Sequence, residues 1–166
     1  SIHNYTMSKF KVVIGENIGQ SGIDYLKNHE KFDVMKLTPE KMDEIKKELA
    51  DAEVFIVRSG IKVTAELLGS AKKLKIVARA GAGVDNIDVD ECTKRGIVVL
   101  RTLGGNSNGV VELTVGNMIA LARFIPKADR LMKNGVWAKG KLKGTELKGK
   151  VLGLLGYGRI GGDVAR

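Results

Sequence analysis

The stretch that most constrains the fold is residues 76–88, IVARAGAGVDNID. It reads as a short buried strand that ends in Arg79, a loop with two glycines and the start of a helix. We expect Gly81 and Gly83 to take positive φ and to let the backbone approach a ligand, with free N–H groups pointing outward beside Arg79. The stretch is therefore either an anion-binding turn or only a tight strand-to-helix connection with an exposed arginine.

Strand and helix patterns alternate along the chain as far as Leu100. Short apolar runs predict strands at residues 10–14, 32–37, 54–57, 76–79 and 97–100. The segments between them predict helices at residues 22–28, 38–50, 64–68 and 89–95, with Thr38, Thr64 and Asp88 as N-caps. Alternation of this kind predicts an α/β fold with a parallel sheet.

Two arginines directly follow or end predicted strands. If the strands are parallel neighbours, Arg58 and Arg79 leave the sheet at the same edge, so two positive charges can face one crevice. Arginine binds carboxylate and phosphate through paired hydrogen bonds, so a doubly charged anion would suit this edge. The alternative is that each arginine caps a helix or pairs with a nearby acid.

The character of the sequence changes after residue 103. A glycine-rich turn at residues 104–107 precedes residues 110–123, which are apolar on nearly every face. We expect a helix buried between layers or against a partner, and not a membrane span, because charged and polar residues interrupt it. The change divides the chain into domains at residues 7–103 and 104–166.

The sequence from Gly156 to Gly161 reads G-x-G-x-x-G, the pattern of dinucleotide-binding turns. It follows a predicted buried strand at residues 151–155 and precedes a helix expected to start near Gly162. In such turns the glycines admit a pyrophosphate to the backbone and let helix and strand pack closely.

Composition excludes several classes of protein. Cys92 is the only cysteine and no apolar signal sequence opens the chain, so we expect a cytoplasmic protein without a disulfide framework. The net charge is +9, but its densest basic run, residues 139–150, has no interleaved aromatic residues for base stacking, so nucleic acid is not an expected partner. No His, Cys, Asp or Glu cluster has metal-ligand spacing. Residues 1–6 are interpreted as a leader.

Several stretches together resemble the N-terminal half of the D-isomer-specific 2-hydroxyacid dehydrogenase family. They are the glycine fingerprint and residues 57–59, 62–65, 79–88, 105–107 and 144–147. Within the family, the chain is most similar to members that oxidise 3-phospho-D-glycerate in the first step of serine biosynthesis. The resemblance implies a flavodoxin-like substrate-binding domain followed by the start of a Rossmann domain that binds NAD.

The resemblance also implies site residues. The phosphate and carboxylate of a small phosphorylated hydroxyacid would contact Arg58, Arg79, Ala82, Gly83 and Val84, with Asn106 nearby. The NAD pyrophosphate would lie against Gly156, Tyr157, Gly158, Arg159, Ile160 and Gly161.

Two further expectations follow from the resemblance. The catalytic arginine, glutamate and histidine of the family are expected beyond Arg166, so this chain alone is expected to be inactive. The protein is expected to form a homodimer or a higher homo-oligomer. Two alternatives to the dehydrogenase function stay open. The chain could belong to a non-catalytic, dinucleotide-sensing binding protein on the same scaffold, similar to corepressors, or it could be an inactive fragment.

Overall fold

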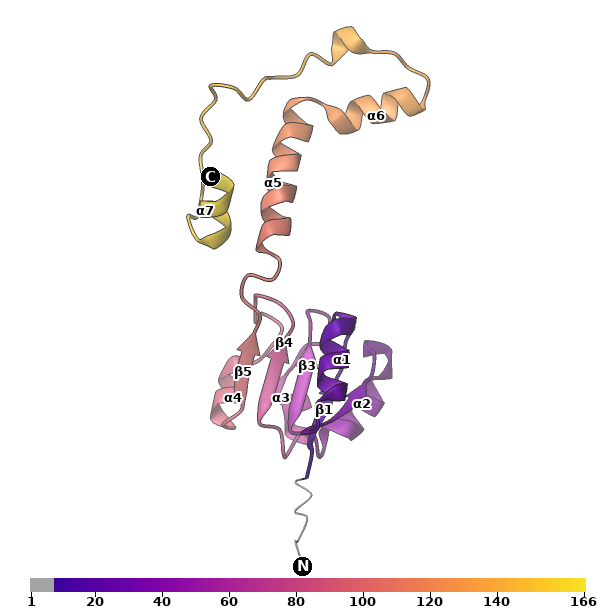
Figure 1. Ribbon diagram of the computed structural model, residues 1–166, viewed down its shortest axis with the longest axis vertical. Coiled ribbons are helices and arrows are strands. Elements are labelled where there is room, and N and C mark those ends of the chain that lie inside the picture. Colours follow the sequence, from indigo (N-terminus) through magenta and orange to yellow (C-terminus); the bar gives the residue numbers. More distant parts are fainter. Residues whose placement is uncertain (1–7) are drawn as a thin grey trace, which may run out of the picture. The chain divides into compact units, whose positions relative to one another are not determined.

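The computed structural model describes residues 8–166 (Figure 1). The leader predicted for residues 1–6 lies outside the described residues. The chain divides into two compact units, one that ends at Leu103 and one that begins at Gly104.

The first unit is built on one parallel sheet. Its five strands are β1 (Phe10–Ile14), β2 (Phe32–Lys36), β3 (Val54–Val57), β4 (Ile76–Arg79) and β5 (Val98–Arg101). All neighbouring pairs are parallel, and the strand order is β2-β1-β3-β4-β5. This is the flavodoxin-like order, which places ligands beyond the carboxyl ends of the strands. The predicted α/β class and parallel sheet are therefore confirmed.

Helices connect the strands as the sequence predicts. They are α1 (Gln20–Asn28), the 3₁₀ turn η1 (Pro39–Lys41) with α2 (Met42–Leu49), α3 (Ala65–Ser70) and α4 (Val89–Lys94). The N-caps at Thr64 and Asp88 are confirmed, because their side chains accept from the N–H groups of Leu67 and Glu91. Thr38 lies at the N-cap position of η1, as predicted, and is followed by Pro39, but its side chain makes no capping bond.

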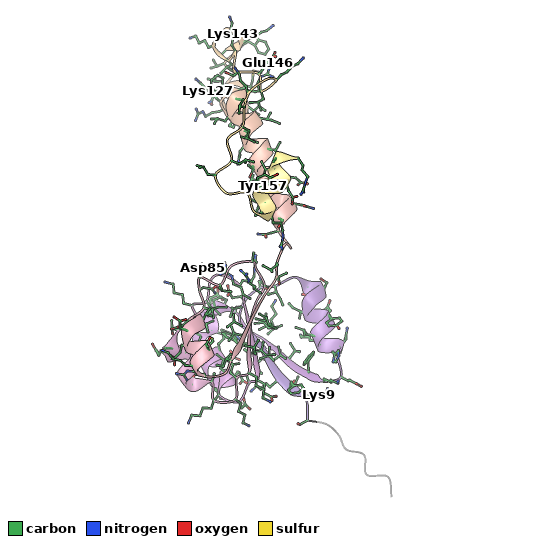
Figure 2. All side chains as sticks on the ribbon, turned by 90° about the vertical axis from the view of Figure 1, so that its left-hand side faces the viewer. Lys9, Asp85, Lys127, Lys143, Glu146 and Tyr157 are labelled. Atoms are coloured by element: carbon green, nitrogen blue, oxygen red, sulfur yellow. The ribbon has the colours of Figure 1, made fainter. Side chains whose placement is uncertain are left out.

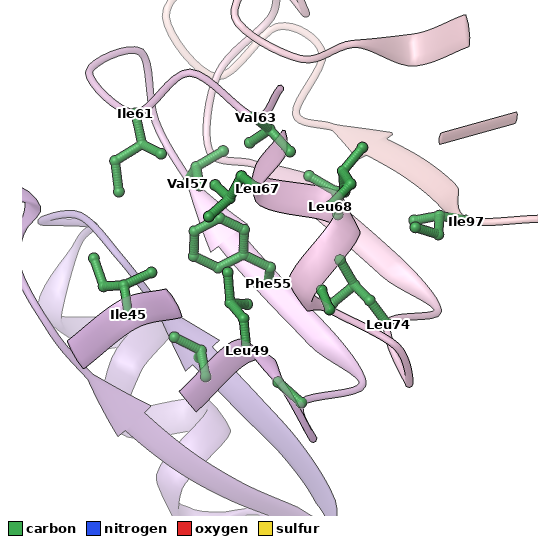
Figure 3. Close-up of a cluster of buried hydrophobic side chains, with 14 of the residues drawn as sticks. Ile45, Leu49, Phe55, Val57, Ile61, Val63, Leu67, Leu68, Leu74 and Ile97 are labelled. Carbon is green, nitrogen blue, oxygen red and sulfur yellow. The ribbon is translucent and has the colours of Figure 1, made fainter. Parts of the chain in front are cut away.

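The core fills the space between the sheet and helices α2, α3 and α4 (Figure 3). Phe55 of β3 is its largest fully buried side chain and lies among Leu49, Leu67 and Leu68. A smaller cluster joins the other face of β1 to Ile23 of α1. Burial alternates along β3, and Phe55 and Val57 point into the larger cluster. This alternation arises because successive side chains of a strand point to opposite faces of the sheet.

The second unit is helical. It contains α5 (Ser107–Ala122), α6 (Ile125–Lys133), the 3₁₀ turn η2 (Lys139–Lys141) and α7 (Arg159–Ala165), which packs beside α5 (Figure 1). The helix predicted at residues 110–123 is not buried between layers of the described chain, since Leu113 is 65% and Leu121 78% exposed, and its burial against a partner stays a prediction. Helices α6 and α7 are too short to cover a helix that is apolar on every side.

The strand predicted at residues 151–155 is also wrong. The segment is irregular, with Val151 97% exposed and Leu155 fully exposed. A strand needs a neighbour to accept and donate its backbone hydrogen bonds, and among residues 104–166 there is no other strand to pair with it.

The described residues contain no single helix that is both long and apolar enough to cross a membrane. Helices α5 and α6 meet those criteria only when joined, and they are bent by 65° to each other.

Candidate functional site

Arg58 and Arg79 lie at the carboxyl edge of the sheet. Strands β3 and β4 are parallel neighbours in which Val57 is the register partner of Arg79, so Arg58 follows one residue beyond that pair. Arg58 is exposed, and its Nη1 lies 3.3 Å from the carbonyl oxygen of Asn17. Two cationic side chains therefore leave adjacent strand ends at the place where parallel α/β sheets bind ligands.

The Arg79 side chain is turned into its own loop and is only 12% exposed. Its Nη1 donates to Oδ1 of Asp85 at 2.6 Å and to Oδ1 of Asn86 at 2.5 Å. The hydrogen bond from Arg79 lowers the pKa of the Asp85 carboxyl, which projects from the loop into solvent (Figure 2). The Nε of Arg79 is buried and has no partner among the described residues. The Nη1 group of Arg79 is therefore bonded within the loop, while its Nε–H donor has no acceptor among the described residues.

The two loop glycines act differently from the prediction. Neither Gly81 nor Gly83 takes positive φ, so that expectation is wrong. They leave room for side chains instead, because a Cβ at Gly81 would lie 3.3 Å from Nε of Arg79 and one at Gly83 2.7 Å from Oδ1 of Asp85, so that one or both side chains would have to shift. Without side chains at these positions, the guanidinium can lie against the loop backbone.

The loop presents several unused backbone donors. Among residues 8–166, no protein acceptor takes the N–H of Ala82, Gly83 or Val84. Two carbonyl groups of the loop are bonded to the carboxyl end of β5 and the residue after it. Thr102 N–H donates to the Gly81 carbonyl at 3.0 Å, and Arg101 Nη1 donates to the Ala82 carbonyl at 3.1 Å. Free N–H groups beside guanidinium groups form a site suited to a carboxylate or phosphate.

Sequence reasoning missed one acidic residue at this edge. Glu16 follows β1, is only 7% exposed, and accepts the backbone N–H groups of Arg58 at 2.6 Å, Gly60 at 2.8 Å and Ile61 at 3.2 Å. The available signal was its place, an acid two residues beyond an apolar strand at the ligand edge of the sheet. Asn86, which lies in the predicted loop, was also given no role.

The second unit carries Asn106 and the glycine fingerprint. Asn106 precedes α5 and makes no side-chain capping bond. Gly156 takes φ +96°, and a Cβ at Gly161 would collide with the carbonyl of Gly156, so the turn requires glycine at both positions. The turn leads into α7, whose first residues are Arg159 and Ile160 and not Gly162 as predicted. Its tight glycine backbone, with an exposed Tyr157 beside it, fits a dinucleotide pyrophosphate.

The described residues contain no group of three His, Cys, Asp or Glu side chains that could hold a metal ion. The groups that the described candidate site offers are guanidinium groups, backbone N–H groups and a buried carboxylate.

The flavodoxin-like sheet with a cationic loop at its carboxyl edge is an α/β domain whose ligand edge suits an anionic small molecule. Residues 12–155 match the profile of the D-isomer specific 2-hydroxyacid dehydrogenase catalytic domain. The chain belongs to this family, as the resemblance predicted.

Individual relatives agree with this assignment. The chain is 53% identical over 123 residues to D-3-phosphoglycerate dehydrogenase of Sus scrofa, a match that covers 74% of this chain and 23% of that protein. It is 43% identical over 160 residues to hydroxypyruvate reductase of Thermotoga maritima, covering 96% of this chain and 52% of that one.

A solved structure shares the fold. The NAD⁺-bound 3-phosphoglycerate dehydrogenase of Entamoeba histolytica matches with a TM-score of 0.74 and 32% identity, over 95% of this chain and 50% of that chain. The chain thus spans between about a quarter and about half the length of these relatives.

Proposed function

We propose that this chain is the substrate-binding part of an NAD-dependent oxidoreductase that acts on 3-phospho-D-glycerate or a related D-2-hydroxyacid, in the first step of serine biosynthesis. The observation that carries the proposal is the joint position of Arg58, Arg79 and the unused N–H groups of residues 82–84. A phosphorylated hydroxyacid has an anion at each end, and two guanidinium groups with a loop of backbone donors match both.

The residues have separate roles in this proposal. The loop at residues 82–84 and Arg79 hold one anionic group of the substrate, and Arg58 holds the other. The fingerprint from Gly156 to Gly161 holds the NAD pyrophosphate, and NAD when bound accepts the hydride from C2 of the substrate.

The free, buried thiol of Cys92 suits a reducing compartment, which supports the cytoplasm as the location.

The similarity to a hydroxypyruvate reductase favours a second candidate, an enzyme whose substrate has one carboxylate and no phosphate. Only one of the two arginines would then face an anion.

Titration of the wild-type chain followed by NMR chemical shifts separates the two candidates. We expect 3-phosphoglycerate to bind at least about tenfold more tightly than glycerate, because the second charged contact adds roughly 1.5–3 kcal/mol. The loop amides of residues 81–85 should shift most. Equal affinity for the two ligands would support the reductase reading, and shifts confined to other segments would rule out this loop as the site.

We propose further that the chain forms a homodimer or higher homo-oligomer through the apolar faces of α5. Its exposed leucines at positions 113 and 121, and a hollow of about 500 Å³ between α5 and α6 lined by residues such as Leu121 and Phe124, support this surface.

Light scattering tests the proposed association. Wild type is expected to exceed the monomer mass of 17.9 kDa, and Leu121→Asp is expected to return to it because a charge would have to be buried in the interface. Tyr25→Asp, at an exposed position on α1 of the first unit, is the matched control and should leave the mass unchanged. A monomeric wild type at high concentration would exclude the association.

A further inference from the structure

The loops at the carboxyl edge of the sheet are joined by a set of side-chain bonds that the proposed binding roles do not use. We call it the loop network and define it as Glu16, residues 58–61, Asn86 and Arg79. Glu16 holds the loop after β3 through three backbone N–H groups. Asn86 links the same loop to the Arg79 guanidinium.

We propose that Glu16 and Asn86 are positioning residues that fix the direction of Arg79 and of the loop carrying Arg58 toward an anionic ligand. The proposal deepens the proposed function and rests on it for the identity of the ligand. It assigns neither residue a contact with the ligand itself.

Glu16 is a buried carboxylate whose two oxygens both serve as acceptors. Oε2 accepts from Arg58 and Ile61, and Oε1 accepts from Gly60. Charge-assisted bonds of this kind are stronger than bonds between neutral groups, so the loop is held more firmly than a turn of its length would be.

Two glycines make the approach of Glu16 possible. A Cβ at Gly60 would lie 2.7 Å from Oε1 of Glu16. A Cβ at Gly15 would lie 2.8 Å from Cδ1 of Ile61 and 2.9 Å from Cε2 of Phe55. The backbone after β1 can therefore pass closely over the core and bring Glu16 under the loop after β3.

Asn86 uses both ends of its amide. Its Nδ2 donates to the carbonyl of Arg58 at 2.8 Å and of Ile61 at 2.7 Å, and its Oδ1 accepts from Nη1 of Arg79. An aspartate at this position could not donate to the two carbonyls, and a leucine could do neither. One amide thus links the backbone of the loop that carries Arg58 to the Arg79 guanidinium.

The first test measures rotation of the Arg79 guanidinium by NMR, in the full chain without ligand. In wild type the bonds to Asn86 and Asp85 should slow rotation of the guanidinium and give separate Nη–H signals. Asn86→Ala should merge these signals or broaden them, whereas Asn28→Ala, at an exposed position on α1, should not. Unchanged Arg79 signals in Asn86→Ala would overturn the proposal, whether or not phosphoglycerate binds.

The second test is a double-mutant cycle for 3-phosphoglycerate binding. Asn86→Ala should weaken binding about three- to tenfold in wild type and clearly less when Arg79 is already alanine, because only the effect that passes through the Arg58 loop then remains. Equal weakening in both backgrounds would mean that no part of the effect passes through Arg79, and would overturn the role of Asn86 in positioning the Arg79 guanidinium. If wild type bound no phosphoglycerate, the proposed function would fail, and the guanidinium signals would still decide the positioning role.

Glu16 is tested by Glu16→Gln, which keeps the size but replaces an acceptor oxygen by a donor NH₂ group facing backbone N–H groups. Amide hydrogen exchange at Arg58, Gly60 and Ile61 is expected to accelerate about tenfold or more, because each loses a charge-assisted bond. Glu30→Gln, at an exposed position between α1 and β2, is the matched control. Exchange that stays the same in Glu16→Gln would remove Glu16 from the proposal.

Discussion

Replacing Phe55 with alanine should lower the free energy of unfolding of the first unit by about 3–5 kcal/mol. The ring is fully buried in the central strand β3, among side chains from α2 and α3 that cannot close the space it would leave (Figure 3). Since natural domains are stable by only about 5–15 kcal/mol, this loss would remove a large share of the stability of the unit. Phe55 also lies beneath Gly15, so its loss should loosen the segment that carries Glu16.

Urea denaturation followed by circular dichroism measures this effect. Phe10→Ala is the control, because it removes the same side chain from a partly exposed position at the start of β1 and should cost about 1 kcal/mol or less. Similar losses for the two variants would contradict the view that the β3 cluster dominates the stability of this unit.

Most of the first unit could be predicted because its signals are local. The strands at residues 10–14, 54–57 and 76–79 are continuous apolar runs closed by glycine or polar residues, and the structure reproduces their bounds. Residues 151–155 have the same local signal and form no strand. A strand is completed by its neighbours, and a run of apolar residues carries no information on whether a neighbour is present.

The position of the two arginines at the ligand edge of the sheet could also be predicted from local signals. The placement of Arg58 and Arg79 at one edge followed from strand order alone, and β3 and β4 are indeed adjacent and parallel. The loop network could not be predicted, because Glu16 bonds residues 42 to 45 positions away and Asn86 bonds residues 25 and 28 positions away. Nor could the inward turn of Arg79, which depends on the room that Gly81 and Gly83 leave beside Asp85.

Arg79→Ala is expected to weaken 3-phosphoglycerate binding by roughly 1.5–3 kcal/mol, or about 10- to 150-fold, the usual range for a hydrogen bond to a charged group. The guanidinium is already held by Asp85 and Asn86 through Nη1, so little conformational freedom is lost when its other nitrogens meet an anion. The lost contact should therefore appear almost entirely as lost affinity. Chemical-shift titration of the full chain provides the dissociation constants.

Arg95→Ala is the matched control for this prediction. Arg95 also bonds an acid and a carbonyl, Glu91 at 2.7 Å and Leu68 at 3.1 Å, but it belongs to the end of α4, outside the loop. Its removal should cost stability without changing affinity. Arg79→Ala alone should also let the pKa of the Asp85 carboxyl rise toward its ordinary value, because the hydrogen bond that lowers it is gone. Equal losses of affinity in the two variants would show that the arginine at the end of β4 supports the fold and not the binding of the anion.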